Sequence, residues 1–173
     1  MYEMSGQKAT ELYLLLELRG VKIWIDGGWA VDALLGEQTR AHEDLDIVVE
    51  TRDLSRMVSL LAGRGITKAG EDYALPWNFL LRNCGRLQVD VHAIVFNAEG
   101  IPMYGPPEAA VVYPDLSGQG IIAGQSVRCT TPQSLVENRT GFELRARDFH
   151  DVRLLCTRFG IELPQQYRQI GEH

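Results

Sequence analysis

The sequence predicts an α/β (α+β) fold, a mixed β-sheet flanked by helices and followed by a C-terminal helical portion. Two observations predict it. Amphipathic helical segments alternate with short apolar strand segments over the first 100 residues, and helical segments predominate near the C-terminus. The length of 173 residues suits one domain. We therefore expect residues 1–173 to form a single domain, with the sheet core in 1–100 and a further strand and helices in 125–160.

The expected helices follow from apolar spacing and from residues typical of helix ends. Leu12, Leu15 and Leu16 recur at helical spacing, and Gly20 ends that pattern. Asp53 is an expected N-cap, and Pro132 suits a first helical turn. The expected helices span Ser5–Arg19, Trp29–Leu35, the residues after Asp53 to Ala62, a segment opening at Thr131-Pro132, and Arg145–Arg158.

The expected strands are short apolar runs bounded by glycine, proline or polar residues, and Leu87–Phe96 is the clearest of them. Residues 97–124 are dense in glycine and proline, so we expect a long irregular segment there, of a kind that is often functional. The expected strands are Val21–Ile25, Leu45–Glu50, Ile66–Ala69, Asn78–Arg82, Leu87–Phe96 and Gln125–Cys129.

Composition excludes several classes of function. A net charge of −6 and a pI near 5.2 argue against a broad grip on nucleic acid and are compatible with a small cationic substrate. The three cysteines are widely spaced, so we expect free thiols and not a disulfide framework or zinc site. No apolar run reaches membrane-spanning length and the start lacks a signal-peptide pattern, so a cytoplasmic protein without a membrane partner is expected.

Two carboxylates, Asp44 and Asp46, stand at the start of an apolar strand. Residues two apart in a strand share a face, so both side chains point one way while Leu45 and Ile47 point into a core. Adjacent carboxylates repel each other unless a cation lies between them, and a hard divalent ion such as Mg²⁺ resolves that conflict. A lone Asp-x-Asp is nevertheless more often a solvated turn or strand end.

A second strand repeats the arrangement, because Asp90 and His92 share a face opposite Val89 and Val91. A charge between valines is expensive to bury without a purpose. If this strand pairs beside the strand of Asp46, three carboxylates converge. Such a set suits two Mg²⁺ ions roughly 3.5–4 Å apart, which clamp the oxygens of a phosphoryl transfer.

A glycine pair, Gly27-Gly28, lies between a predicted strand and a predicted helix. Glycine allows close approach of a ligand, and a helix N-terminus offers free N–H groups to an anion. Arg40 and His42 precede the acid pair and are candidates to reach the β and γ phosphates of a nucleotide. The alternative is that both are ordinary surface residues.

Three further groups of residues are open to more than one interpretation. Asp148 and Asp151 lie three apart on a predicted helix and either bind a cationic amine or pair with a nearby arginine. The three tryptophans either stack on adenine or belong to the core, with Trp77 the best candidate to touch substrate. The 71–73 segment is a candidate wall of an acceptor pocket, through Glu71, Asp72 and Tyr73.

Together these motifs resemble the polymerase-β-like nucleotidyltransferases, and within them the branch of aminoglycoside 2″-adenylyltransferases and lincosamide nucleotidyltransferases. The resemblance runs from about Leu12 to Gly160. It is carried by Trp24-Ile25-Asp26-Gly27-Gly28-Trp29-Ala30-Val31-Asp32, Arg40-x-His42-x-Asp44-x-Asp46, Asp90 in its strand, the segment Gly120–Cys129, and Arg147-Asp148-x-x-Asp151.

The resemblance implies a nucleotidyltransferase fold and an enzyme that moves AMP from ATP to a hydroxyl group. Asp44 and Asp46 would hold two Mg²⁺ ions, and Asp90 would complete the metal site or act as general base. Gly27 and Gly28 would lie against the triphosphate, assisted by Arg40. In the wider superfamily a serine usually occupies the position of Gly28, and its loss leaves phosphate binding to the backbone; the antibiotic branch shares this departure.

The acceptor remains open at this stage. A small, hydroxyl-bearing, cationic antibiotic is expected, with an aminoglycoside slightly favoured over a lincosamide because of the acidic composition and the segment Gly120–Cys129. A protein acceptor of the toxin–antitoxin type is one alternative, although residues 97–124 are expected to cover a small pocket. A non-catalytic nucleotide-binding module is another, although such a module has no need of three carboxylates. The oligomeric state is undetermined.

Overall fold

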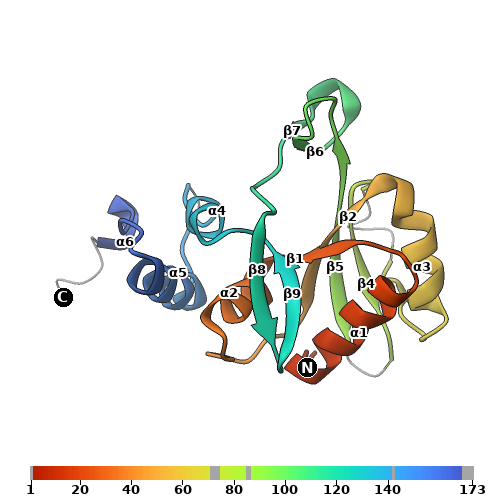
Figure 1. The fold of residues 1–173 in the computed structure, drawn as a ribbon, viewed down its shortest axis with the longest axis horizontal. Coiled ribbons are helices and arrows are strands. Elements are labelled where there is room, and N and C mark those ends of the chain that lie inside the picture. The colour runs from red at the N-terminus through yellow and green to blue at the C-terminus, as the bar shows by residue number, and fades with distance from the viewer. Residues whose placement is uncertain (1, 71–74, 85–86, 142, 169–173) are drawn as a thin grey trace.

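A computed structural model describes residues 2–70, 75–84, 87–141 and 143–168. Figure 1 shows a twisted sheet with helices packed against it and the last helices gathered at one end. The helices are α1 (Gly6–Leu18), α2 (Gly27–Leu35), α3 (Leu54–Ala62), α4 (Pro132–Glu137), α5 (Ala146–Phe159) and α6 (Gln165–Arg168), with 3₁₀ turns η1 (Thr51–Asp53) and η2 (Pro107–Ala109). The strands are β1 (Ile23–Ile25), β2 (Leu45–Glu50), β3 (Thr67–Lys68), β4 (Asn78–Arg82), β5 (Gln88–Phe96), β6 (Pro102–Tyr104), β7 (Val111–Val112), β8 (Gly118–Ile122) and β9 (Gln125–Cys129).

The described strands form one mixed sheet, in the order β3-β4-β5-β2-β1-β9-β8, with β6 and β7 extending from β5. β2 pairs with β5 and β1 with β9 in parallel, while the other pairs are antiparallel. The parallel register places Asp46 directly opposite Asp90. The predicted mixed sheet flanked by helices is therefore confirmed, and the two acidic strands are neighbours in it.

The main core covers one face of this sheet. Leu45, Ile47 and Val49 alternate along β2 and are at most 1% exposed, and Val89 and Val91 do the same on β5. Residues of α1, α2, α3, α4 and α5 complete the same cluster. The opposite face of β2 and β5 therefore carries the acidic side chains, as the alternation in the sequence predicts.

That opposite face changes character along the strands. Two residues beyond Asp46 and His92 lie Val48 and Ile94, both fully buried, and they join Trp24, Tyr113 and Leu116 in a second, smaller apolar cluster. The acidic group thus occupies one end of this face and an apolar cluster occupies the next part.

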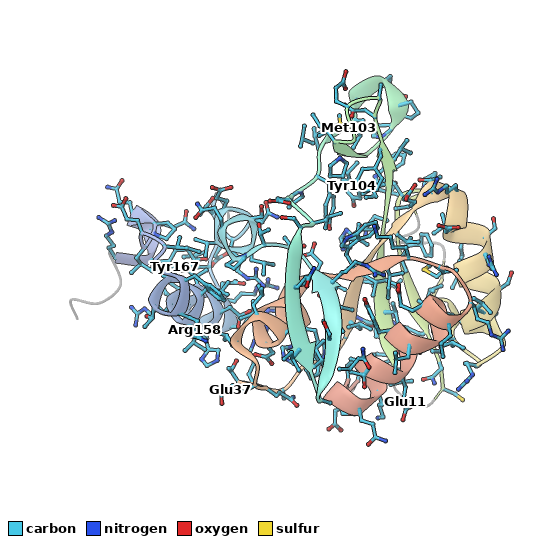
Figure 2. All side chains as sticks on the ribbon, viewed as in Figure 1. Glu11, Glu37, Met103, Tyr104, Arg158 and Tyr167 are labelled. Carbon is cyan, nitrogen blue, oxygen red and sulfur yellow. The ribbon has the colours of Figure 1, made fainter. Side chains whose placement is uncertain are left out.

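The prediction for residues 97–124 is wrong. This segment contains β6, η2, β7 and β8. β6 and β7 form an arm that projects from the sheet, where Met103 and Tyr104 lie far from Tyr167 on the last helix (Figures 1 and 2). β8 instead joins the sheet edge beside β9. Gly120 permits this packing, because a Cβ there would lie 2.4 Å from the backbone of Ala33 in α2.

Smaller differences concern element ends and unpredicted elements. α2 begins at Gly27 and not at Trp29, because the Asp26 carboxylate caps the helix two residues earlier by accepting the Gly27 N–H. Asp53 occupies the N-cap position of α3 but makes no side-chain capping bond. α6 was not predicted. Cys84, Cys129 and Cys156 are free thiols, as expected. Within the described residues, no helix is both long and apolar enough to cross a membrane.

Candidate active site

The acidic end of the sheet opens into a cavity of about 1010 Å³. One wall comes from the sheet and the start of α2, and the other from α4, α5 and the segment between them. The described lining residues are Tyr2, Glu3, Lys8, Asp26, Gly27, Gly28, Arg40, Ala41, His42, Glu43, Asp44, Asp46, Asp90, His92, Leu135, Asn138, Arg139, Arg145, Arg147, Asp148 and Asp151. None of these comes from residues 97–124, so the expected cover over the pocket is not found in the described structure.

All three predicted carboxylates line this cavity. Asp46 on β2 faces Asp90 on β5, and one ligand atom of each lies within 4.8 Å of the other and of one nitrogen of His92. Asp44 is outside this closest group, because its Oδ2 accepts a hydrogen bond of 3.3 Å from the amide of Gln88. The structure thus brings the predicted trio into one cavity, with His92 closer to the Asp46–Asp90 pair than Asp44 is.

The carboxylates disfavour one another's ionisation. Burial raises the pKa of Asp46 well above its usual value, and the charges of Asp44, Asp26 and Asp90 raise it further, while Arg139 opposes them. The pKa of Asp90 is also raised, first by burial and then by Asp44, against the opposing effects of His92 and a hydrogen bond from Asn78. Carboxylates in this state are suited to a bound divalent cation, which offsets both the burial and the repulsion.

Asp26 is a further carboxylate beside the predicted three, and sequence reasoning treated it only as part of a turn. Its Oδ1 accepts the Gly27 N–H at 2.8 Å and its Oδ2 accepts the Tyr113 hydroxyl at 2.5 Å. The signal in the sequence was its position directly before the glycine pair, where an aspartate acts as a helix N-cap. Burial, followed by the charge of Asp26, raises the pKa of Tyr113, so this hydroxyl stays a donor to Asp26.

The glycine pair is required by space as well as by backbone conformation. Gly27 has φ +60°, and a Cβ there would lie 1.9 Å from Oδ2 of Asp46. A Cβ on Gly28 would lie 2.4 Å from Nη2 of Arg40 and 2.6 Å from Nδ1 of His42. The backbone therefore approaches the carboxylates on one side and a cationic side chain on the other, at the N-terminus of a nine-residue helix.

Arg40 lies over this turn but is already paired. Its Nε and Nη2 donate to the two oxygens of Asp151 at 2.8 and 2.9 Å, and Nη1 lies 3.1 Å from Nδ1 of His42. The hydrogen bonds to Asp151, outweighing burial, raise the pKa of Arg40, so the guanidinium keeps its charge. Arg40 can face a phosphate only as a member of this ion pair or after leaving it.

His42 is not a surface residue, because it is only 4% exposed. Its Nε2 lies 2.5 Å from Oδ2 of Asp32, and its ring packs against Trp29 with centroids 4.5 Å apart. With Arg40 donating to Nδ1, the tautomer that fits these contacts carries its proton on Nε2 and donates to Asp32. His42 therefore links α2 to Arg40, and it lines the same cavity.

The two aspartates of α5 differ from each other. Asp148 accepts from the backbone and the guanidinium of Arg145, at 2.9 and 3.2 Å, so the predicted arginine pairing holds for it. Asp151 is buried and pairs with Arg40 and Arg139, neither of which was predicted as its partner. Both carboxylates hold arginines, so neither is placed to bind a substrate amine in this arrangement.

A basic wall faces the carboxylates across the cavity. Its members are Arg139, Arg145 and Arg147; sequence reasoning missed Arg139 and considered the other two only as motif residues or ion-pair partners of the α5 aspartates. Trp24 and Trp29 are core residues, and Trp77 is half-buried outside the described lining. Glu71, Asp72 and Tyr73, the candidate wall of the acceptor pocket, lie outside the described residues.

Known proteins resemble this chain over nearly its whole length. The sequence model of the aminoglycoside-2″-adenylyltransferase family matches residues 9–155. A 2″-aminoglycoside nucleotidyltransferase of Klebsiella pneumoniae is 30% identical over 172 residues, covering 92% of both chains. A lincosamide resistance protein of Staphylococcus haemolyticus is 27% identical over 159 residues, covering 88% of this chain and 98% of that protein.

Solved structures show the same fold. The lincosamide antibiotic adenylyltransferase LnuA, crystallised with lincomycin bound, superposes with a TM-score of 0.80 at 23% identity, covering 92% of this chain and 99% of that one. The family match spans most of the chain and includes the glycine turn, the acidic strands and most of α5. The chain therefore belongs to the aminoglycoside-2″-adenylyltransferase family and is a nucleotidyltransferase.

Proposed function

We propose that this enzyme transfers AMP from ATP, with Mg²⁺, to a hydroxyl group of a small cationic antibiotic. The observation that carries the proposal is the direct pairing of Asp46 with Asp90 on parallel strands, beside the Gly27-Gly28 turn. Relatives in the same family carry names that specify an aminoglycoside or a lincosamide. ATP as the donor suits the cytoplasm, where it is plentiful.

The donor set fits a hard divalent cation. Asp46 and Asp90 present carboxylate oxygens close enough to share one cation, and burial, followed by the neighbouring carboxylates, raises the pKa of both. Asp44 joins them once its side chain leaves Gln88, which completes a set for two Mg²⁺ ions. Bound Mg²⁺ would neutralise the charge that develops on the transferred phosphoryl group. The imidazole nitrogen of His92 is a softer donor than a carboxylate oxygen, so we place His92 beside the metal ligands and not among them.

The residues around this set supply the other requirements of an in-line transfer. The Gly27-Gly28 turn and the N–H groups of α2 that follow Gly27 bind phosphate oxygens, and Arg139 of the basic wall adds positive charge. Asp90 accepts the proton of the acceptor hydroxyl, a step worth on the order of 10²–10⁴ in rate. The acceptor hydroxyl attacks the α-phosphorus, and pyrophosphate leaves.

Two exposed carboxylates at the cavity favour a polycationic acceptor. Glu3 and Glu43 are exposed carboxylates that line the same cavity, outside the proposed metal set. Several ammonium groups, as on an aminoglycoside, use such carboxylates better than the single amine of a lincosamide does. We therefore place an aminoglycoside ahead of a lincosamide. A protein acceptor of the toxin–antitoxin type and a non-catalytic nucleotide-binding module remain the alternatives.

Pyrophosphate release tests the proposed reaction. We expect release that requires ATP, Mg²⁺ and a member of an aminoglycoside and lincosamide panel, and that is lost in Asp46→Asn. Asp53→Asn is the matched control, because Asp53 lies outside the cavity at the start of α3 and should retain activity. Release with a protein acceptor alone would favour the toxin–antitoxin type of reaction. Nucleotide binding without release under any condition would favour a binding module.

A further inference from the structure

A side-chain amide on β4 holds one of the proposed catalytic carboxylates. Nδ2 of Asn78 donates to Oδ1 of Asp90 at 3.0 Å and to the carbonyl oxygen of Val91 at 3.2 Å. Asn78 is the first residue of β4, and its partner across the antiparallel ladder is His92. Asp90 lies two residues before His92 on β5, so the Asn78 amide bonds to a carboxylate next to its ladder partner on the same face of the sheet.

These two bonds fix the orientation of the Asn78 amide. Both acceptors, a carboxylate oxygen and a backbone carbonyl, require an N–H donor. The flipped amide would place an oxygen against two oxygens, which would repel it. Both protons of Nδ2 are therefore committed, and the amide acts as a rigid support for Asp90.

The support makes the two oxygens of Asp90 unequal. Oδ1 accepts from Asn78 and lies 3.9 Å from Nε2 of His92. Within the described part of the chain, no side chain donates a hydrogen bond to Oδ2. Oδ1 is therefore held by a side-chain donor, whereas Oδ2 has no side-chain donor among the described residues. Asp90 is half-buried, so water has limited access to this carboxylate.

We propose that Asn78 is a positioning residue that holds Oδ1 of Asp90 and thereby directs Oδ2 to the divalent cation or the acceptor hydroxyl. This inference rests on the proposed function. Hydrogen-bonded supports of metal ligands change metal affinity or activity by about 10–100-fold when they are removed. A purely structural role is the competing explanation, because the bond to Val91 also ties β4 to β5.

The test compares Asn78→Leu with Leu80→Ala in the full chain. Asn78→Leu keeps bulk on β4 but removes the donor. Leu80 is the ladder partner of Asp90 on the same strand and lies outside the cavity lining, so Leu80→Ala disturbs β4 packing without touching the donor. Asn78→Ala is a second variant without the packing demand of leucine, in case Asn78→Leu does not fold.

The readouts are the kcat and the KM for ATP, and Mn²⁺ affinity measured by calorimetry on the metal-free protein. We expect Asn78→Leu to lower kcat by about 10–100-fold with a KM for ATP within about twofold of the wild type, while Leu80→Ala keeps both within about threefold. A kcat within twofold of the wild type would overturn the inference, as would an equal loss in Leu80→Ala.

The Mn²⁺ measurement separates this inference from the proposed function. If the wild type transfers no AMP to any acceptor, the proposed function fails, and Mn²⁺ affinity alone then decides the role of Asn78. An affinity lowered about tenfold or more in Asn78→Leu, and unchanged in Leu80→Ala, supports the positioning role. Equal affinity in the wild type and Asn78→Leu overturns it.

Discussion

Asp151→Ala removes the carboxylate that joins α5 to the loop before β2. Asp151 accepts two hydrogen bonds from Arg40 and one of 3.4 Å from Arg139, and its own side chain is 2% exposed. The alanine variant therefore leaves two guanidinium groups facing each other without their shared counter-charge. We expect the cost to fall on stability first, because this pair spans 111 residues of sequence and joins the two walls of the cavity.

The magnitude follows from burial. Removing one partner of a fully buried ion pair costs about 3–5 kcal/mol. The Arg40 and Arg139 side chains are 21% and 12% exposed, so water recovers part of that cost. We expect a loss of about 2–3 kcal/mol, which for a domain of this size lowers Tm by about 4–12 °C.

Thermal unfolding followed by calorimetry measures this loss. The matched control is Glu162→Ala, which removes an acid paired with Arg168 where both side chains are more than half exposed. It should change the unfolding free energy by less than about 0.5 kcal/mol. The double variant Arg40→Ala/Asp151→Ala should be less destabilised than the sum of the single variants. A loss in Asp151→Ala no larger than in Glu162→Ala would refute the reasoning.

Three further outcomes are expected. Gly27→Ala should lower both stability and activity, because its Cβ would meet Asp46 at 1.9 Å on a backbone of positive φ; calorimetry and a pyrophosphate assay check this, and a fully active variant would contradict it. Asp46→Asn should abolish transfer yet stabilise the metal-free protein by about 0.5–2 kcal/mol, because it removes a carboxylate whose charged form is disfavoured by burial and by the neighbouring acids; a destabilised variant in thermal unfolding would contradict it. The pKa of Asp148 is lowered: burial opposes ionisation, but hydrogen bonds from Arg145 outweigh it. Ionised Asp148 should therefore stabilise the folded protein fully at pH values above its unfolded pKa of about 4, and this stabilisation should be lost as the pH falls through its lower folded pKa. In urea titrations, the difference in unfolding free energy between the wild type and Asp148→Asn should narrow only in that acid range.

Local patterns in the sequence predicted the parts of the fold that alternate strictly. The i, i+2 alternation around Asp46 and Asp90 predicted both strands and their core faces, because burial on one side imposes that pattern. Residues 97–124 gave no such pattern. Val111 and Val112 of β7 are both exposed, and β8 carries two glycines, so these strands exist through pairing with neighbours and not through alternation. The single-domain organisation stays a prediction.

Local patterns in the sequence also predicted only part of the site. Spacing along each strand predicted that Asp44 and Asp46 share one face and that Asp90 lies opposite the core face of its own strand, while their convergence was conditional on the two strands pairing. It could not predict that Asp151 would hold Arg40 or that Asn78 would hold Asp90, because those contacts depend on tertiary packing between distant segments. Arg40 lines the cavity as a candidate phosphate contact would, and its guanidinium is paired with Asp151 because a buried carboxylate needs a cationic partner.

The central claim is that the acidic pair on β2 and β5 transfers AMP to a small antibiotic. The most direct measurement is mass spectrometry of an aminoglycoside and lincosamide panel incubated with the protein, ATP and Mg²⁺, beside the Asp44→Ala variant. We expect one added adenylyl group on at least one compound, and none with the variant. An unmodified panel, under conditions where the protein binds the nucleotide, would contradict the claim.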